Sequence, residues 1–86
     1  MYTEAIEDLD KATEINPSNA EVYLLRGLAR DALGLHLDAI SDYSAAIDIN
    51  SGYAEAWYKR GISRFISEDL TGAIDDFSRA NQSRAL

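Results

Sequence analysis

Cysteine is absent from the 86-residue chain, and proline, histidine, methionine and tryptophan occur once each. The lack of cysteine excludes disulfide bonds and thiolate metal sites. The lone histidine, His36, provides neither a metal-ligand set nor a catalytic triad, and no glycine-rich phosphate loop is present. We therefore expect a non-enzymatic protein with no catalytic residues, no metal and no cofactor.

Basic residues and long apolar runs are also scarce. The chain has eight lysines and arginines and 15 acidic residues, which gives a net charge of −7. This balance argues against nucleic acid as a partner, because such binding depends on basic side chains that neutralise phosphates. No run of about 18 apolar residues is present, so a membrane is not expected as a partner either. No secretory signal follows Met1, which favours the cytoplasm without fixing the compartment.

The chain is built from a repeat with a period of 34 residues. Residues 20–53 are followed directly by a second copy over residues 54–86, and the same offset extends backwards into residues 1–19. A fixed period of this length is typical of stacked helical repeats, which present surfaces and seldom carry chemistry. The aligned positions include Ala5, Ala39 and Ala73; Asp8, Asp42 and Asp76; Arg26 and Arg60; Gly27 and Gly61; and Arg30 and Arg64.

The spacing of apolar residues predicts an all-α fold with no sheet. Ser18 and Glu21 predict a capping box at the start of the second helix, and Gly34 predicts a left-handed residue after its end. Glu68 occupies the position equivalent to Gly34 in the next copy. Connections of two to five residues predict antiparallel neighbours, and hence an α-solenoid of helix pairs. The five predicted helices cover residues 2–15, 20–33, 37–49, 54–67 and 70–84.

These residues resemble the tetratricopeptide repeat, a helix–turn–helix whose pattern sets a large aromatic and a glycine in the first helix. Tyr23 and Trp57 occupy the aromatic position, Gly27 and Gly61 the glycine position, and Pro17 the turn. Along the second helices, the small, large and small positions hold Ala5, Leu9 and Ala12; Ala39, Tyr43 and Ala46; and Ala73, Phe77 and Ala80.

The resemblance covers essentially the whole chain and implies about two and a half repeats in one domain over residues 1–86. Residues 1–19 would be a half repeat that has only its second helix. Residues 20–53 would be a full repeat. Residues 54–86 would be a second full repeat, whose last helix caps the stack with a polar outer face.

Two pairs of arginines depart from the family pattern. Arg26 and Arg60 replace its leucine, and Arg30 and Arg64 replace its tyrosine. We interpret Arg26 and Arg60 as structural ion pairs with the periodic aspartates, because buried charges are normally paired. The alternative is that these arginines point into a groove and clamp a ligand carboxylate. The aspartates in question are Asp8, Asp42 and Asp76.

The resemblance implies a protein–protein interaction module that binds a peptide or helix in a concave, largely apolar groove lined by the first helices. Some members of the family hold acidic C-terminal peptides with a clamp of Lys, Arg and Asn. Only Lys59 is of that type here, so we expect an apolar or basic-amphipathic partner. The predicted groove residues are Glu21, Leu24, Leu25, Leu28, Asp31, Glu55, Tyr58, Lys59, Ile62 and Phe65.

A second surface is predicted on the first helix, where Tyr2, Ala5, Leu9 and Ala12 would lie against the helix that the half repeat lacks. An open apolar face of this kind favours self-association, so a homo-oligomer is expected. The alternative function is therefore a self-assembling scaffold, which includes a designed or truncated repeat fragment. The mass of the oligomer distinguishes the two functions.

Overall fold

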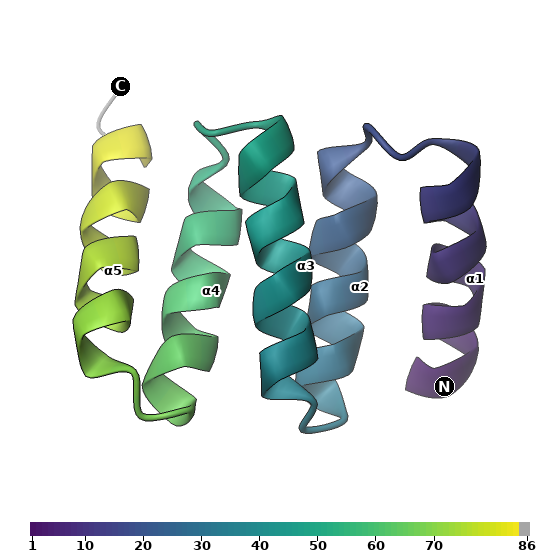
Figure 1. Ribbon diagram of the computed structural model, residues 1–86, viewed down its shortest axis with the longest axis horizontal. Helices are drawn as coiled ribbons and strands as arrows, with labels where there is room; N and C mark the ends of the chain where they lie inside the picture. Colours follow the sequence, from purple (N-terminus) through teal and green to yellow (C-terminus); the bar gives the residue numbers. More distant parts are fainter. Residues whose placement is uncertain (85–86) are drawn as a thin grey trace.

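The computed structural model describes residues 1–84, which form an all-helical α-solenoid with no strand in that range. Successive helices lie side by side in chain order and run antiparallel to their neighbours (Figure 1). The predicted helix boundaries are correct to within one residue, although positions 85 and 86 of the last predicted repeat lie outside the described residues. The helices are α1 (Tyr2–Ile15), α2 (Ala20–Ala32), α3 (His36–Ile49), α4 (Ala54–Ile66) and α5 (Leu70–Arg84).

The helices pack tightly in two hairpins because a glycine in one helix receives an aromatic ring from the next. A Cβ atom added at Gly27 in α2 would lie 2.5 Å from Cε1 of Tyr43 in α3. The same addition at Gly61 in α4 would lie 2.7 Å from Cε1 of Phe77 in α5. Only glycine allows the two helices to approach this closely, which explains why glycine recurs at this position of the repeat. The central core contains Leu24, Ala39, Tyr43, Ala46, Ile47 and Ala56.

The turn before α2 corrects the predicted capping box. The N-cap of α2 is Asn19, whose side chain accepts a hydrogen bond from the backbone N–H of Glu21 at 3.1 Å. Ser18 instead donates its backbone N–H to the side chain of Asn16. Asparagine is as good an N-cap as serine, and Asn19 lies directly beside the helix start.

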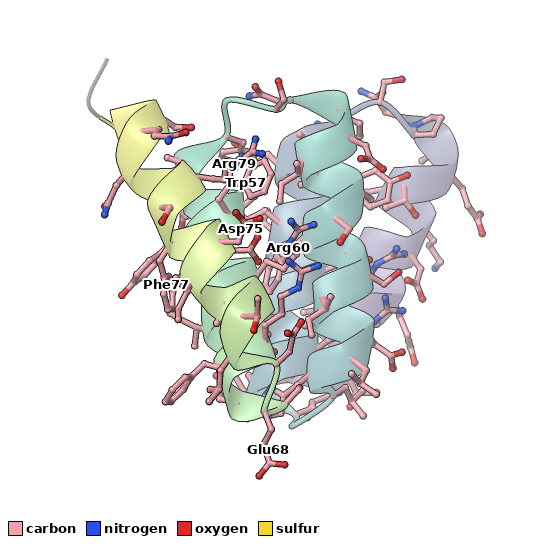
Figure 2. The ribbon with its side chains drawn as sticks, turned by 60° about the vertical axis from the view of Figure 1, so that its left-hand side comes forward. Trp57, Arg60, Glu68, Asp75, Phe77 and Arg79 are labelled. Carbon is pink, nitrogen blue, oxygen red and sulfur yellow. The ribbon has the colours of Figure 1, made fainter. Side chains whose placement is uncertain are left out.

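Helices α2 and α4 end in the same Schellman motif although their sequences differ there. Gly34 follows α2 with a φ of +81°, and its successor Leu35 donates its backbone N–H to the carbonyl of Arg30. Glu68 follows α4 with a φ of +68°, and Asp69 donates in the same way to Arg64. Glu68 is therefore a non-glycine residue held in a left-handed conformation, with its side chain pointing into solvent at the turn (Figure 2).

Replacing Glu68 with glycine is expected to raise the free energy of unfolding by about 1 kcal/mol, because glycine adopts this conformation without strain. Thermal or urea unfolding followed by circular dichroism measures the change. The matched control is Gly34→Ala, which introduces the same strain at the equivalent position and should destabilise by a similar amount. A loss of stability in Glu68→Gly would contradict the assignment of strain to this turn.

Candidate functional site

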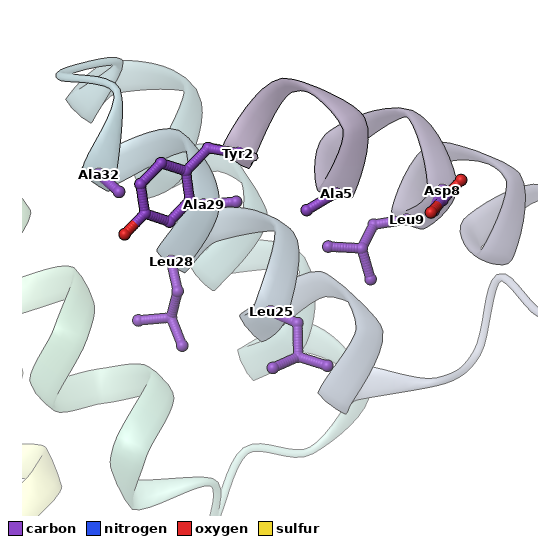
Figure 3. Close-up of a pocket in the computed structure, with 8 residues that line it drawn as sticks. All are labelled: Tyr2, Ala5, Asp8, Leu9, Leu25, Leu28, Ala29 and Ala32. Atoms are coloured by element: carbon purple, nitrogen blue, oxygen red, sulfur yellow. The ribbon is translucent and has the colours of Figure 1, made fainter.

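A hollow of about 580 Å³ opens between α1 and α2. Tyr2, Ala5 and Leu9 project from α1 toward α2, as Figure 3 shows. Leu25 and Leu28 belong to α2 and were predicted as part of a separate groove. The two surfaces that the sequence analysis treated apart thus meet in one place. This N-terminal hollow is lined by Tyr2, Ala5, Asp8, Leu9, Leu25, Leu28, Ala29 and Ala32.

The chemistry of the N-terminal hollow is apolar with a single acid. Of its eight lining residues only Asp8 carries a charge. Asp8 is exposed, and within the described residues it makes no hydrogen bond and no ion pair. Ala12, the remaining residue of the predicted self-association face, is half-buried and does not line the hollow.

The equivalent aspartates elsewhere in the repeat are fully engaged. Asp42 is buried in α3 and accepts hydrogen bonds from Nη2 of Arg26 at 2.8 Å and from Nη1 of Arg30 at 2.9 Å. The bonds to Asp42 raise the pKa of Arg26 above its ordinary value, against the opposing effect of partial burial. The arginines thus point into the helix pair and not into a groove.

The second hairpin repeats this arrangement. Asp76 in α5 is buried and accepts bonds from Arg60 at 2.9 Å and from Arg64 at 3.0 Å. No polar side-chain atom that is buried within the described residues lacks a partner. Each hairpin therefore contains one buried carboxylate that is paired with two arginines one helical turn apart.

The first arginine of each pair also reaches back to the preceding helix. Nη1 of Arg26 donates to Asp10 in α1 at 2.8 Å, and Nη1 of Arg60 donates to Ser44 in α3 at 3.0 Å. The aspartates predicted as partners of Arg26 and Arg60 included Asp8 and did not include Asp10. Asp8 makes no contact with Arg26, because it lies on the face of α1 that borders the hollow. Asp10 and Ser44 are separated by the repeat period, which was the signal that could have identified the contact.

Asp31, another predicted groove residue, forms part of a partly buried polar cluster. Its carboxylate accepts hydrogen bonds from the hydroxyl of Tyr43 at 2.6 Å and from Ser63 at 2.7 Å. Nδ1 of His36 lies 2.9 Å from the other carboxylate oxygen. Burial, followed by the bond to Asp31, raises the pKa of Tyr43. Ser63 donates to the acid and not to the imidazole, so these residues do not form a nucleophile–base pair.

Leu24 was predicted in the groove, but the structure places it in the core. Its side chain is 3% exposed and belongs to the same core cluster as Tyr43 of α3 and Ala56 of α4. Tyr58, one repeat period after Leu24, is 40% exposed, and the centre of its ring lies 5.8 Å from the centre of the Phe77 ring. The same repeat position is thus internal in one copy and superficial in the next.

The remaining predicted groove residues fall outside the N-terminal hollow. Glu21 and Glu55 are exposed at the starts of α2 and α4. Ile62 is half-buried, and Phe65 is 60% exposed. Lys59 is half-buried with its ammonium 5.9 Å from the centre of the Tyr58 ring. The structure therefore brings only Leu25 and Leu28 of the predicted groove to the hollow.

Family profiles described as tetratricopeptide repeats match three parts of the chain. One matches residues 38–85, which is more than half of the sequence. Another matches residues 20–53, and a profile described as a TPR repeat matches residues 1–34. The chain belongs to the tetratricopeptide repeat family. Repeats of this family build surfaces for other proteins and are typically non-catalytic.

Solved structures, two of them of domains described as TPR, agree with the fold. A crystal structure of MamA matches with a TM-score of 0.95 and 27% identity, over 98% of this chain and 49% of MamA. The first TPR of Spaghetti (RPAP3), bound to the HSP90 peptide SRMEEVD, matches with a TM-score of 0.93 and 30% identity, over 95% of this chain and 65% of that one. The Sgt2 TPR domain from Aspergillus fumigatus matches with a TM-score of 0.93 and 28% identity, over 98% of this chain and 56% of that domain.

The chain therefore spans between about half and two thirds of the length of these relatives. No curated protein sequence matches it. In the part of the tetratricopeptide repeat that the structure describes, no helix has the length and apolar character needed to cross a membrane. The same residues contain no group of three or more histidines and acids placed to hold a metal ion.

Proposed function

We propose that this tetratricopeptide repeat chain is a non-enzymatic interaction module that binds an apolar or basic-amphipathic segment of a partner protein in the N-terminal hollow. The observation that carries the proposal is the open volume of about 580 Å³, lined by seven residues without charge and by Asp8. An apolar hollow with one unpaired acid suits a ligand that offers apolar side chains and a cation.

The charge of the chain supports this choice of partner. Two structures of Spaghetti (RPAP3) hold the peptide SRMEEVD, which contains three acidic residues and one arginine. In the present chain the four repeat arginines are engaged by aspartates, and the net charge is −7. An acidic peptide would meet repulsion here, whereas a basic one would be attracted.

Self-assembly is the alternative, because Tyr2, Ala5 and Leu9 could also receive a second copy of the chain. Helix α1 carries five acids and one lysine, so two copies paired through α1 would bring like charges together. Sedimentation equilibrium at micromolar concentration distinguishes the two functions. A monomer mass supports the binding module, and a defined dimer that dissociates with Leu25→Glu supports the scaffold.

The direct test is the binding of two labelled amphipathic helical peptides of equal length and identical apolar face, one with arginines and one with glutamates on the polar face. Fluorescence anisotropy should show binding of the arginine peptide only. Leu25 lines the hollow and is 43% exposed, so Leu25→Glu should weaken that binding by about tenfold or more without unfolding the protein.

The control variant is Leu37→Glu, an exposed leucine on α3 that does not line the hollow. It introduces the same charge and should leave the affinity unchanged. Equal binding of both peptides, or equal losses in the two variants, would contradict the proposed site.

A further inference from the structure

We infer, on the basis of the proposed function, that the N-terminal hollow binds an α-helix of a partner protein with two arginines four residues apart and a glycine directly after the first. Asp8 accepts hydrogen bonds from both arginines. The partner helix thereby occupies the position on α1 that α2 occupies on α3 and that α4 occupies on α5.

The first support is the burial of the equivalent residues in the two complete hairpins. Ala5 and Leu9 line the hollow, whereas Ala39 and Tyr43, one period later, are fully buried beneath α2. Two periods later, Ala73 is 1% exposed beneath α4. The hollow is thus the surface that a preceding helix covers in every other copy of the repeat.

The second support is the unpaired acid. Asp42 accepts bonds from Arg26 and Arg30, at distances between 2.8 and 3.1 Å. Asp8 is one repeat period before Asp42 and has no such donors within the described residues. A helix that supplies arginines with the same spacing satisfies this carboxylate in the geometry that the chain already uses twice.

The third support concerns shape. Gly27 receives Tyr43 and Gly61 receives Phe77, because a Cβ at either glycine would overlap the ring. Leu9 stands at the same repeat position as these two aromatic residues. A glycine immediately after the first arginine of the partner helix therefore lets its backbone approach Leu9 as closely as the other hairpins do.

The contact between α2 and α4 indicates the residue type at one further position of the partner helix. Asp31 lies five residues after Arg26 and accepts a bond from Ser63 of α4. The residue one period before Ser63 is Ala29, which is buried and offers no hydrogen-bond donor in its side chain. The partner helix should therefore carry an apolar residue, and not an acid, five positions after its first arginine.

A second copy of the chain does not meet these requirements. Arg26, Arg30, Arg60 and Arg64 are already held by aspartates of their own hairpins. The charge of α1 also opposes its pairing with itself. We therefore assign the required helix to a partner protein with free arginines, which the acidic α1 attracts.

The sequence of α4 supplies a probe with the complete pattern. A synthetic peptide with the sequence of residues 53–67 contains arginines at 60 and 64, a glycine at 61 and a phenylalanine at 65. Labelled with fluorescein, it should bind the full-length protein in an anisotropy titration. Asp8→Asn should weaken the binding by about tenfold or more, because the loss of a charge-assisted hydrogen bond has that effect.

The matched control is Glu7→Gln, which removes one charge from the neighbouring exposed residue of α1, outside the hollow. It should change the affinity by less than about twofold, the effect of a screened surface charge. A peptide with Arg60→Gln and Arg64→Gln should bind wild-type protein about as weakly as the parent peptide binds Asp8→Asn. Equal losses in Asp8→Asn and Glu7→Gln would overturn the inference.

The outcomes separate this inference from the proposed function. If the glutamine peptide binds as tightly as the parent peptide and Leu25→Glu still weakens it, the hollow binds helices but the arginine pairing is wrong. If binding is unaffected by both Leu25→Glu and Asp8→Asn, the peptide has exchanged with α4 in its own hairpin, and the site itself is wrong. If neither peptide binds, both proposals fail for this class of ligand.

Discussion

The variant Asp42→Ala is expected to unfold with a free energy about 3–5 kcal/mol lower than that of the wild-type protein. Asp42 is 2% exposed and is the shared acceptor of Arg26 and Arg30. Removing it leaves Arg30 without a carboxylate and Arg26 with Asp10 alone, which costs more than the loss of an exposed salt bridge. Urea unfolding at neutral pH measures the change.

The control for this prediction is Asp48→Ala, which removes an exposed acid from the same helix and should change the stability by less than about 0.5 kcal/mol. If Asp42→Ala fails to fold, Asp42→Asn keeps the shape of the side chain and provides a milder measurement. Stability equal to wild type in both Asp42 variants would show that the arginine–aspartate pairs do not hold the hairpins together.

The second large effect is expected for Gly27→Val, which should lower the free energy of unfolding by about 3 kcal/mol. The new Cβ would lie 2.5 Å from Cε1 of Tyr43. This ring is fully buried, and its hydroxyl is held by Asp31 at 2.6 Å, so it has little freedom to move aside. Thermal unfolding followed by circular dichroism measures the loss.

The double variant Gly27→Val with Tyr43→Leu tests the cause, because the smaller side chain makes room for the added methyl groups. The two changes should be less destabilising together than the sum of their separate effects. Ser41→Val, on an exposed position of α3, reports the cost of a β-branched residue alone. Strict additivity would contradict a direct contact between Gly27 and Tyr43.

The fold could be predicted from the sequence because its main determinants are local or periodic. Helix lengths follow from apolar spacing, and the order of packing follows from a repeat whose small and large positions recur together. The predicted N-cap of α2 was wrong, because Ser18 and Asn19 are adjacent in sequence and both residue types are good N-caps. The left-handed conformation of Glu68 was harder to predict from the sequence, because a glutamate side chain disfavours the positive φ that the rest of the turn imposes.

The candidate site was predicted only in part. Leu25 and Leu28 were predicted as part of a binding stripe, and Tyr2, Ala5 and Leu9 as an open face, but no sequence pattern indicated that the two surfaces form one hollow. This required the relative placement of α1 and α2, which no single-helix pattern contains.

The misplaced residues have a common physical origin. Leu24 and Asp31 lie on the predicted groove stripe. Leu24 shares the core cluster with Ala56 of α4, however, and Asp31 accepts a hydrogen bond from Ser63 of α4. Helical periodicity describes the neighbours of a helix within its own hairpin and does not describe the contact between first helices of successive repeats. Comparison of each residue with its equivalent one period away would have indicated where such contacts begin and end.

The most direct test of the account is a nuclear magnetic resonance titration of the full-length protein with the peptide of residues 53–67. We expect shift changes concentrated on the methyl groups of Ala5, Leu9 and Leu25, and a marked weakening of these changes in Asp8→Asn at the same peptide concentration. Shift changes centred on α5 around Phe77, or changes that persist undiminished in Asp8→Asn, would contradict it.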